Sequence, residues 1–167
     1  MPVSLRDRLH DEMTAATRSR DVLRRDTLRM AWAAVYAVEK RDGATLTDEQ
    51  TVTVLTREVK TRRESVDAYR TGGREDLAAK EQAEIAILGE FLPRPLGPDE
   101  VDALVAEGIA ATGATSPRDL GKVMAWLSPR TRGRADGKVV SGLVAKALAQ
   151  ADLAAHDAAG HGGDGRA

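Results

Sequence analysis

The spacing of apolar residues along the chain predicts helices throughout and shows no alternating strand pattern. Apolar residues recur every three or four positions in successive segments, as they do on one face of an α-helix. Seven helices are expected: one opening at Ser4, one over 21–41, one from Thr47 to the glycines at 72 and 73, one over 74–91, one opening at Pro98, one from Ser116 to Ser128, and one opening at Asp136. The pattern therefore predicts an all-α protein.

Two of these helices are predicted to form an antiparallel hairpin. Only Gly72 and Gly73 separate the long third helix from the fourth, which leaves no room for any other arrangement. Arg62 and Glu81 interrupt the apolar seams of these helices at nearly the same height above the turn. Helices rise by about 1.5 Å per residue, so Arg62 is expected to meet Glu81 or the nearby Glu84 across the hairpin.

Prolines mark one clear boundary. Pro93, Pro95 and Pro98 cannot sustain a helix and predict a semi-rigid extended linker. We therefore expect an N-terminal bundle of about four helices over 1–92, a linker over 93–98, a small three-helix domain over 99–148 and a tail over 149–167. The tail has no apolar pattern, so we expect it to be disordered.

The most distinctive stretch is basic and runs from Leu120 to Val140. Its helix is expected to stop at Ser128-Pro129, and the following loop leads to a new helix with Asp136 as its N-cap. This combination of guanidinium groups, glycines and a helix start favours the binding of phosphate groups. The predicted anion or RNA contacts are Lys122, Arg130, Arg132, Arg134, Gly137 and Lys138. The alternative interpretation is an ordinary solvated loop.

Two neighbours of these charges have roles that the sequence leaves open. Trp126 could stack on a base or pack between helices, and neither role is favoured. Gly121 is more simply explained by a close approach of two helices than by a ligand contact.

Composition narrows the possible functions further. The chain has no cysteine and only 3% aromatic residues, so disulfides and thiolate chemistry are excluded and the cores must be aliphatic. No apolar run approaches the roughly 20 residues of a membrane span. The N-terminus has no signal-peptide core either, and a cytoplasmic protein is expected.

Catalytic machinery is not visible in the sequence. Pairs of acids such as Asp48-Glu49 occupy first helical turns, where the helix dipole explains them. No serine has a histidine or lysine partner in a motif, and His156 and His161 lack the further ligands a metal would need. No catalytic residue, cofactor or metal is therefore predicted.

Several motifs resemble the GatB/YqeY family, and they agree with it in order and spacing over roughly residues 3 to 148. They are Met30, Arg57-Glu58-Val59-Lys60, Gly72-Gly73-Arg74-Glu75-Asp76-Leu77, Phe91-Leu92-Pro93, Leu120-Gly121-Lys122-Val123-Met124 and Gly133-Arg134-Ala135-Asp136-Gly137-Lys138. The resemblance is to stand-alone YqeY-like proteins, which are related to the tail of the B subunit of tRNA-dependent amidotransferase.

That resemblance implies an all-helical, non-catalytic accessory module that binds tRNA or another structured RNA through the basic loop. It also implies a possible protein partner in aminoacyl-tRNA metabolism. Two alternatives stay open. One is a protein-interaction adapter whose basic loop docks on an acidic protein surface. The other is a non-catalytic part of a carbon–nitrogen ligase complex that uses glutamine as amide donor.

Overall fold

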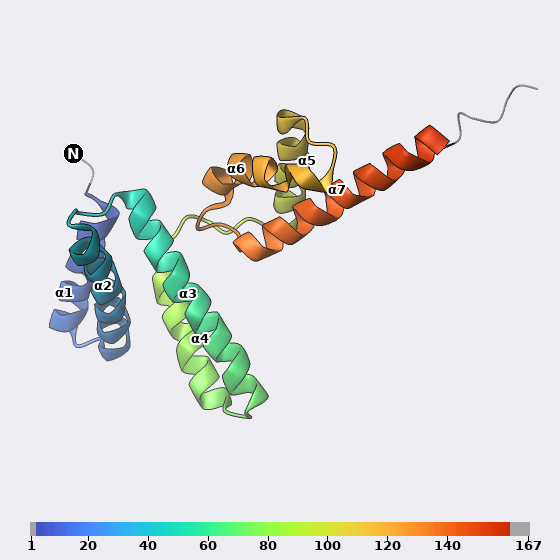
Figure 1. Cartoon of the computed structure of the whole chain (residues 1–167). Coiled ribbons are helices and arrows are strands. Elements are labelled where there is room, and N and C mark those ends of the chain that lie inside the picture. Colours follow the sequence, from blue (N-terminus) through green and yellow to red (C-terminus); the bar gives the residue numbers. More distant parts are fainter. Residues whose placement is uncertain (1–2, 161–167) are drawn as a thin grey trace, which may run out of the picture. The chain divides into compact units, whose positions relative to one another are not determined.

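The computed structural model describes residues 3–160, and within them the chain forms helices and no strand (Figure 1). The all-α class predicted from the sequence is confirmed. The elements are α1 (Leu5–Ser19), α2 (Val22–Asp42), α3 (Asp48–Thr71), α4 (Glu75–Gly89), α5 (Pro98–Thr112), the 3₁₀ turn η1 (Pro117–Asp119), α6 (Leu120–Thr131) and α7 (Gly137–Gly160). They fall into two compact units, unit 1 up to Pro93 and unit 2 from Arg94.

Local capping signals fix where the helices of unit 1 begin. The Ser4 hydroxyl accepts a hydrogen bond from the Asp7 amide at 3.0 Å, as its N-cap position predicts. Thr47 and Gln50 form a reciprocal capping box at the start of α3. These caps satisfy amides that the first helical turn leaves without an intrahelical partner.

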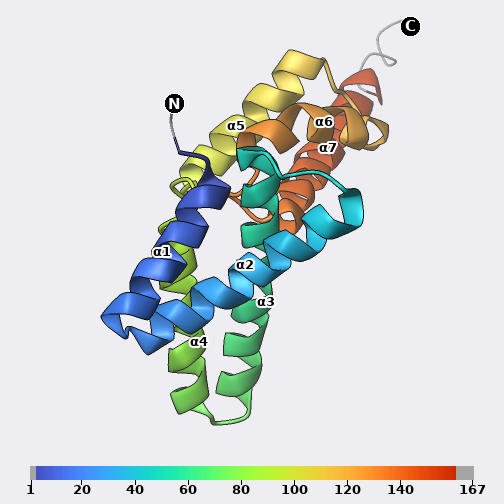
Figure 2. The ribbon, with the colours of Figure 1, turned by 90° about the vertical axis from the view of Figure 1, so that its left-hand side faces the viewer.

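The core of unit 1 is aliphatic and lies where α2 meets its neighbours. α2 packs beside α1 and runs across the hairpin of α3 and α4 (Figure 2). The buried cluster consists of Leu9, Leu28, Ala31, Val35, Leu46, Leu55, Val59, Leu88 and Phe91. Burial of these side chains, each contributing about 1.5–3 kcal/mol for the larger ones, holds α1 and α2 on the hairpin.

A buried carboxylate ties α1, α2 and the loop before α3 together. Glu39 of α2 accepts from Arg6 Nε at 2.6 Å and from the Leu46 amide at 3.0 Å. Arg6 and then the Leu46 amide stabilise the charged form, so the pKa of Glu39 lies below its ordinary value of 4.5 although burial opposes the shift. The loop that leads into α3 is therefore anchored by charge.

A buried ion pair crosses the α3–α4 hairpin, as the sequence predicted. Arg62 Nε lies 2.9 Å from a carboxylate oxygen of Glu84, and both side chains are buried. Glu58, one turn earlier on α3, accepts from Arg62 Nη1 at 2.9 Å. Of the two candidates predicted to face Arg62, Glu84 is the partner. Arg62 and Glu84 lie at matching heights because only three residues, 72–74, separate the two helices.

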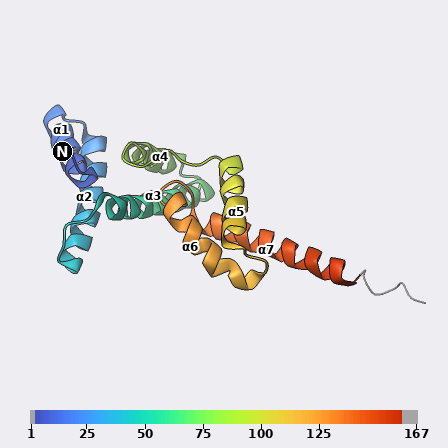
Figure 3. The same ribbon diagram turned by 90° about the horizontal axis from the view of Figure 1, so that it is seen from above.

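In unit 2 the helices α5, α6 and α7 pack against one another around a second aliphatic core (Figure 3). Its buried members are Val101, Val105, Ala114, Val123, Leu127, Val140, Val144 and Leu148. A Cβ added at Gly108 of α5 would lie 3.0 Å from the Trp126 ring and 3.2 Å from Leu127, so glycine permits this contact between α5 and α6. Nothing lies within 4 Å of a Cβ at Gly121, so the close approach expected there occurs at Gly108 instead.

The expected end of α6 at Ser128-Pro129 is wrong. The helix continues through Pro129 to Thr131, because the proline sits in the last turn and costs only one backbone hydrogen bond. Leu127 and Thr131 are buried on either side of it, and side chains bond the nearby carbonyls: Ser128 Oγ donates to the Met124 oxygen at 2.7 Å. Packing and local hydrogen bonds outweigh the helix-breaking tendency.

The expectation of disorder from residue 149 is also wrong as far as Gly160, because α7 continues to that residue. Residues 149–159 are rich in alanine, the strongest helix former, and they extend the helix without an apolar face. The rest of the predicted tail, residues 161–167 with His161, lies outside the described residues.

The buried pair predicts a large and selective cost of mutation. Replacing Glu84 with Ala leaves Arg62 buried with only Glu58 as a charged partner, which should lower the free energy of unfolding by about 2–3 kcal/mol. Glu81→Ala is the matched control, since Glu81 lies on the same helix and does not contact Arg62 by an ion pair. Chemical denaturation measures both, and equal losses would contradict the assignment of Glu84.

Because Glu39 is buried and paired with Arg6, we expect the free energy of unfolding to depend on pH. Its pKa is lowered in the folded state, so its contribution is present above pH 4.5 and is lost as the pH falls through the folded-state pKa. Glu39→Gln should be clearly less stable than the wild type at pH 7. That gap should shrink as the pH drops below 4.5. Thermal unfolding of both proteins over pH 3 to 7 tests this, and a constant gap would refute it.

Candidate nucleic-acid interface

The basic stretch of unit 2 is distributed over a helix, a short turn and a second helix start. Residues 118–138 carry six basic residues against two acids. Lys122 lies in the first turn of α6, Arg130 in its last turn, and Arg132 caps its C-terminus. Arg134 lies in the turn that follows, and Lys138 in the first turn of α7. The loop is thus shorter than the sequence suggested, because α6 includes Arg130.

The predicted end of the helix at Ser128-Pro129 would place Arg130 in the loop. In the structure Arg130 lies in the last turn of α6 and contacts its own helix. Its Nη1 donates to the Trp126 carbonyl at 2.6 Å, and its guanidinium lies 3.7 Å from the centroid of the Trp126 ring. A Cβ added at Gly108 of α5 would lie only 3.0 Å from the same ring, so the ring is packed tightly against this glycine. The indole therefore packs within unit 2, which is the plainer of the two roles left open for it.

Arg134, also predicted as an anion or RNA contact, joins the proline-rich segment to the turn after α6. Its Nε donates to the Arg94 carbonyl at 3.0 Å, and its own carbonyl accepts from the Leu96 amide at 2.8 Å. Arg94 in turn binds Glu100 of α5, with Nη1 3.0 Å from Oε2. Arg94 and then the Gly97 amide lower the pKa of Glu100 to about 2. Arg134 is consequently part of the structure of unit 2.

The start of α7 is capped as predicted. Asp136 Oδ1 accepts from the Lys138 amide at 2.8 Å, so one amide of this helix start is already satisfied. Gly133 has a φ of 71°, which turns the chain between α6 and α7. Gly137 and Lys138 are exposed, and a Cβ on Gly137 would meet open space. The Lys138 amine is thus presented at the surface.

The outward face of α6 was not anticipated from the sequence. Gly121, Ala125 and Pro129 follow one another at every fourth residue, and all three are exposed. Because these side chains are small, this face of α6 is flat. Lys122 and Arg132 are exposed beside it. Arg118, exposed in the turn before α6, adds a further cation that the prediction omitted. The four-residue spacing of these small residues is visible in the sequence. Recognising it as an exposed face requires knowing which face of α6 is buried.

The acids of unit 2 are most concentrated on α5. α5 carries four acids, Asp99, Glu100, Asp102 and Glu107, and no basic residue. The six cations of residues 118–138 lie on η1, α6, the turn after it and the start of α7, while Lys146 lies further along α7 with Asp152 and Asp157. This separation gives the unit a basic surface that can attract a polyanion although its charges balance overall.

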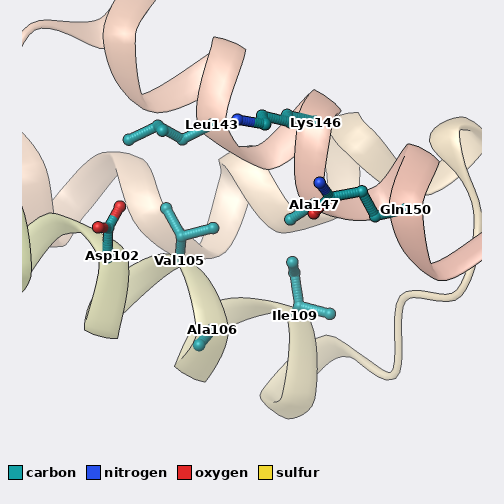
Figure 4. Close-up of a pocket in the computed structure, with 8 residues that line it drawn as sticks. All are labelled: Asp102, Val105, Ala106, Ile109, Leu143, Lys146, Ala147 and Gln150. Carbon is teal, nitrogen blue, oxygen red and sulfur yellow. The ribbon is translucent and has the colours of Figure 1, made fainter.

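A groove of about 430 Å³ lies between α5 and α7 (Figure 4). Val105, Ile109, Leu143 and Ala147 give it an apolar floor, while Asp102, Lys146 and Gln150 supply polar groups. Among these lining residues there is no histidine or hydroxyl, and the one carboxylate and one amine lie on opposite helices. The groove can take an apolar side chain, but its residues form no acid–base pair.

No cluster of three potential metal ligands occurs between residues 3 and 160. Within that same range, none of the helices combines the length and the apolar character that crossing a membrane requires.

Comparison with known proteins places the chain among related sequences. The family model described as Yqey-like protein matches residues 6–148. A protein of Pyrenophora tritici-repentis named "Altered inheritance of mitochondria protein 41, mitochondrial" is 28% identical over 138 residues, covering 80% of this chain and 75% of that protein. An uncharacterized protein of Schizosaccharomyces pombe is 32% identical over 89 residues, covering 53% of this chain and 69% of that protein.

The hydrogen bonds between Arg134 and the segment at Arg94 and Leu96 predict that replacing Arg134 will loosen that segment locally. Arg134→Ala removes the hydrogen bond to the Arg94 carbonyl, which is worth on the order of 1–2 kcal/mol. Amide exchange at Leu96 and Gly97 should become faster, while exchange in the helices of unit 1 should not change. Hydrogen–deuterium exchange measures both, and unchanged protection at Leu96 would contradict a stabilising role for the Arg134–Arg94 hydrogen bond.

Proposed function

The chain belongs to the YqeY-like protein family, and on that premise we propose that unit 2 binds tRNA or another structured RNA as a non-catalytic accessory module. The observation that carries the proposal is the exposed basic face of α6 and the adjoining start of α7. Lys122 and Lys138 are exposed there, and the side chains on the outward face of α6 are too small to keep a polyanion at a distance.

The geometry supports contact with phosphates rather than with bases. Trp126 is the only aromatic residue from Arg94 onward, and Arg130 and Gly108 both contact its ring. Recognition of single-stranded bases relies on aromatic rings that are free to stack. A level, cationic helix face is better matched to the sugar–phosphate backbone of a folded RNA, which presents regularly spaced negative charge.

The cations differ in what they can offer such a ligand. Arg134 is committed to the Arg94 carbonyl and Arg130 to the Trp126 carbonyl and ring, so their removal would disturb unit 2 as well as any RNA contact. Lys122 and Lys138 are exposed at two helix starts, and within residues 3–160 no salt bridge involves either amine. These two lysines are therefore the residues with which to test RNA contact.

A salt series with total tRNA tests the proposal. Each phosphate contact should contribute about 0.7–0.9 to the slope of log affinity against log salt concentration. Replacing both Lys122 and Lys138 with Ala should weaken binding and flatten that slope by about one to two units, with little change in thermal stability.

The matched control removes the same charge elsewhere. Lys60→Ala combined with Lys146→Ala takes one exposed lysine from α3 and one from α7, neither of them on the basic face of α6. This control should bind tRNA with the wild-type slope. Unchanged tRNA affinity in the Lys122/Lys138 variant would overturn the RNA assignment and favour docking of the same cations on an acidic protein surface.

A further inference from the structure

Exposed apolar side chains gather on one helix of unit 1. The described residues include seven large apolar side chains that are exposed: Val3, Val22, Leu23, Met30, Tyr36, Val139 and Leu153. Four of them belong to α2, where Met30 is 58% and Tyr36 54% exposed. A single exposed apolar residue needs no explanation, but several on one helix face indicate a contact surface.

The outer face of α2 has a regular order. Asp26, Ala33 and Lys40 are each seven residues apart and lie in line along the helix, since seven residues make nearly two turns. Met30 and Ala37 lie on one flank of this line, and Arg29 and Tyr36 lie on the other. All seven residues are exposed. The opposite face of α2 supplies Leu28, Ala31 and Val35 to the core, so the described residues of unit 1, 3–93, leave this outer face exposed.

We propose that this face binds a second copy of the same chain, with the two α2 helices antiparallel and Ala33 at the two-fold axis. In such a pair, a residue on the central line lies opposite the central-line residue the same number of positions beyond Ala33 on the other copy, and flank residues pair to within one position of this rule. Asp26 is seven before and Lys40 seven after. Each Asp26 therefore faces the partner's Lys40, and two equivalent ion pairs close the ends of the contact.

The flanks match as well. A two-fold axis perpendicular to both helices brings each flank against the same flank of the other copy. Met30 then lies against the partner's Ala37, a long side chain beside a short one. On the other flank the Arg29 guanidinium reaches the ring of the partner's Tyr36, where a cation–π contact forms.

Self-complementarity favours this arrangement over other ways of covering the face. A parallel pair would place Asp26 against Asp26 and Lys40 against Lys40, and like charges repel. Ala33 at the centre lets the helices approach to the short end of the usual range of about 8–10 Å. Asp26 already pairs with Arg25 at 2.8 Å, yet its side chain is half exposed and can accept a second cation.

Sedimentation of the full-length chain over a concentration series tests the proposal. The wild type should pass from monomer to dimer as concentration rises. Ala33→Glu places two carboxylates at the axis and should give a monomer at every concentration. Ala79→Glu, on the exposed face of α4, is the matched control and should dimerise like the wild type. A wild type that stays monomeric throughout, or an Ala33→Glu variant that dimerises normally, overturns the proposal.

Two further variants test the register and orientation. Asp26→Lys and Lys40→Asp should each weaken the dimer, while the two changes in one chain should restore it, which a purely structural effect would not do. The chain has no cysteine, so Ala33→Cys introduces the only thiol. Under mild oxidation this variant should form a disulfide-linked dimer far faster than Ala79→Cys. Equal rates for both, or no rescue by the double exchange, would refute the antiparallel register.

Discussion

The ion pair between Arg62 and Glu84 fixes the register of the hairpin on which unit 1 is built. A guanidinium buried in a two-helix hairpin needs carboxylates at the right height, and Glu84 and Glu58 provide them. Sliding α4 by one turn would separate the buried Arg62 and Glu84, and breaking a buried ion pair costs more than most apolar mismatches. Because α1 and α2 pack on the same hairpin, their positions follow from this register. An aliphatic core with few aromatic side chains has little other means of specifying a unique alignment.

Polar anchors play the same part where the chain changes direction. Glu39 holds Arg6 and the loop at Leu46, and Arg134 holds the segment at Arg94 and Leu96. In each case one long or charged side chain satisfies backbone groups that helices cannot reach. A consequence for function follows in unit 2. Some of its arginines serve the fold, so the number of basic residues in the sequence overstates the number available to a ligand.

Local signals in the sequence predicted the seven helices of residues 3–160 and several of their caps, and they narrowed the partner of Arg62 to two residues, of which Glu84 is the one observed. Caps and a short turn depend on residues only a few positions apart, so the local sequence specifies them. The site was harder to predict because its geometry depends on distant contacts. The bond from Arg134 to Arg94 spans forty residues. Pro129 stays helical because Leu127 and Thr131 are buried, and Gly108 rather than Gly121 meets the neighbouring helix because of which faces pack. Alanine propensity, which apolar periodicity does not detect, extends α7 to Gly160.

The two proposals concern separate units and have a shared consequence. A dimer formed through α2 would carry two copies of the basic face of α6. If one RNA can reach both, the second contact becomes intramolecular, and its strength is set by an effective concentration rather than by the concentration of free protein. A few exposed lysines, each adding a modest and salt-sensitive term, could then give stable binding. The apparent affinity for a long RNA would fall in the Ala33→Glu variant even though that substitution removes no cation, whereas the affinity for a short RNA that spans only one basic face would not change. That difference separates avidity from a direct effect on the RNA contact.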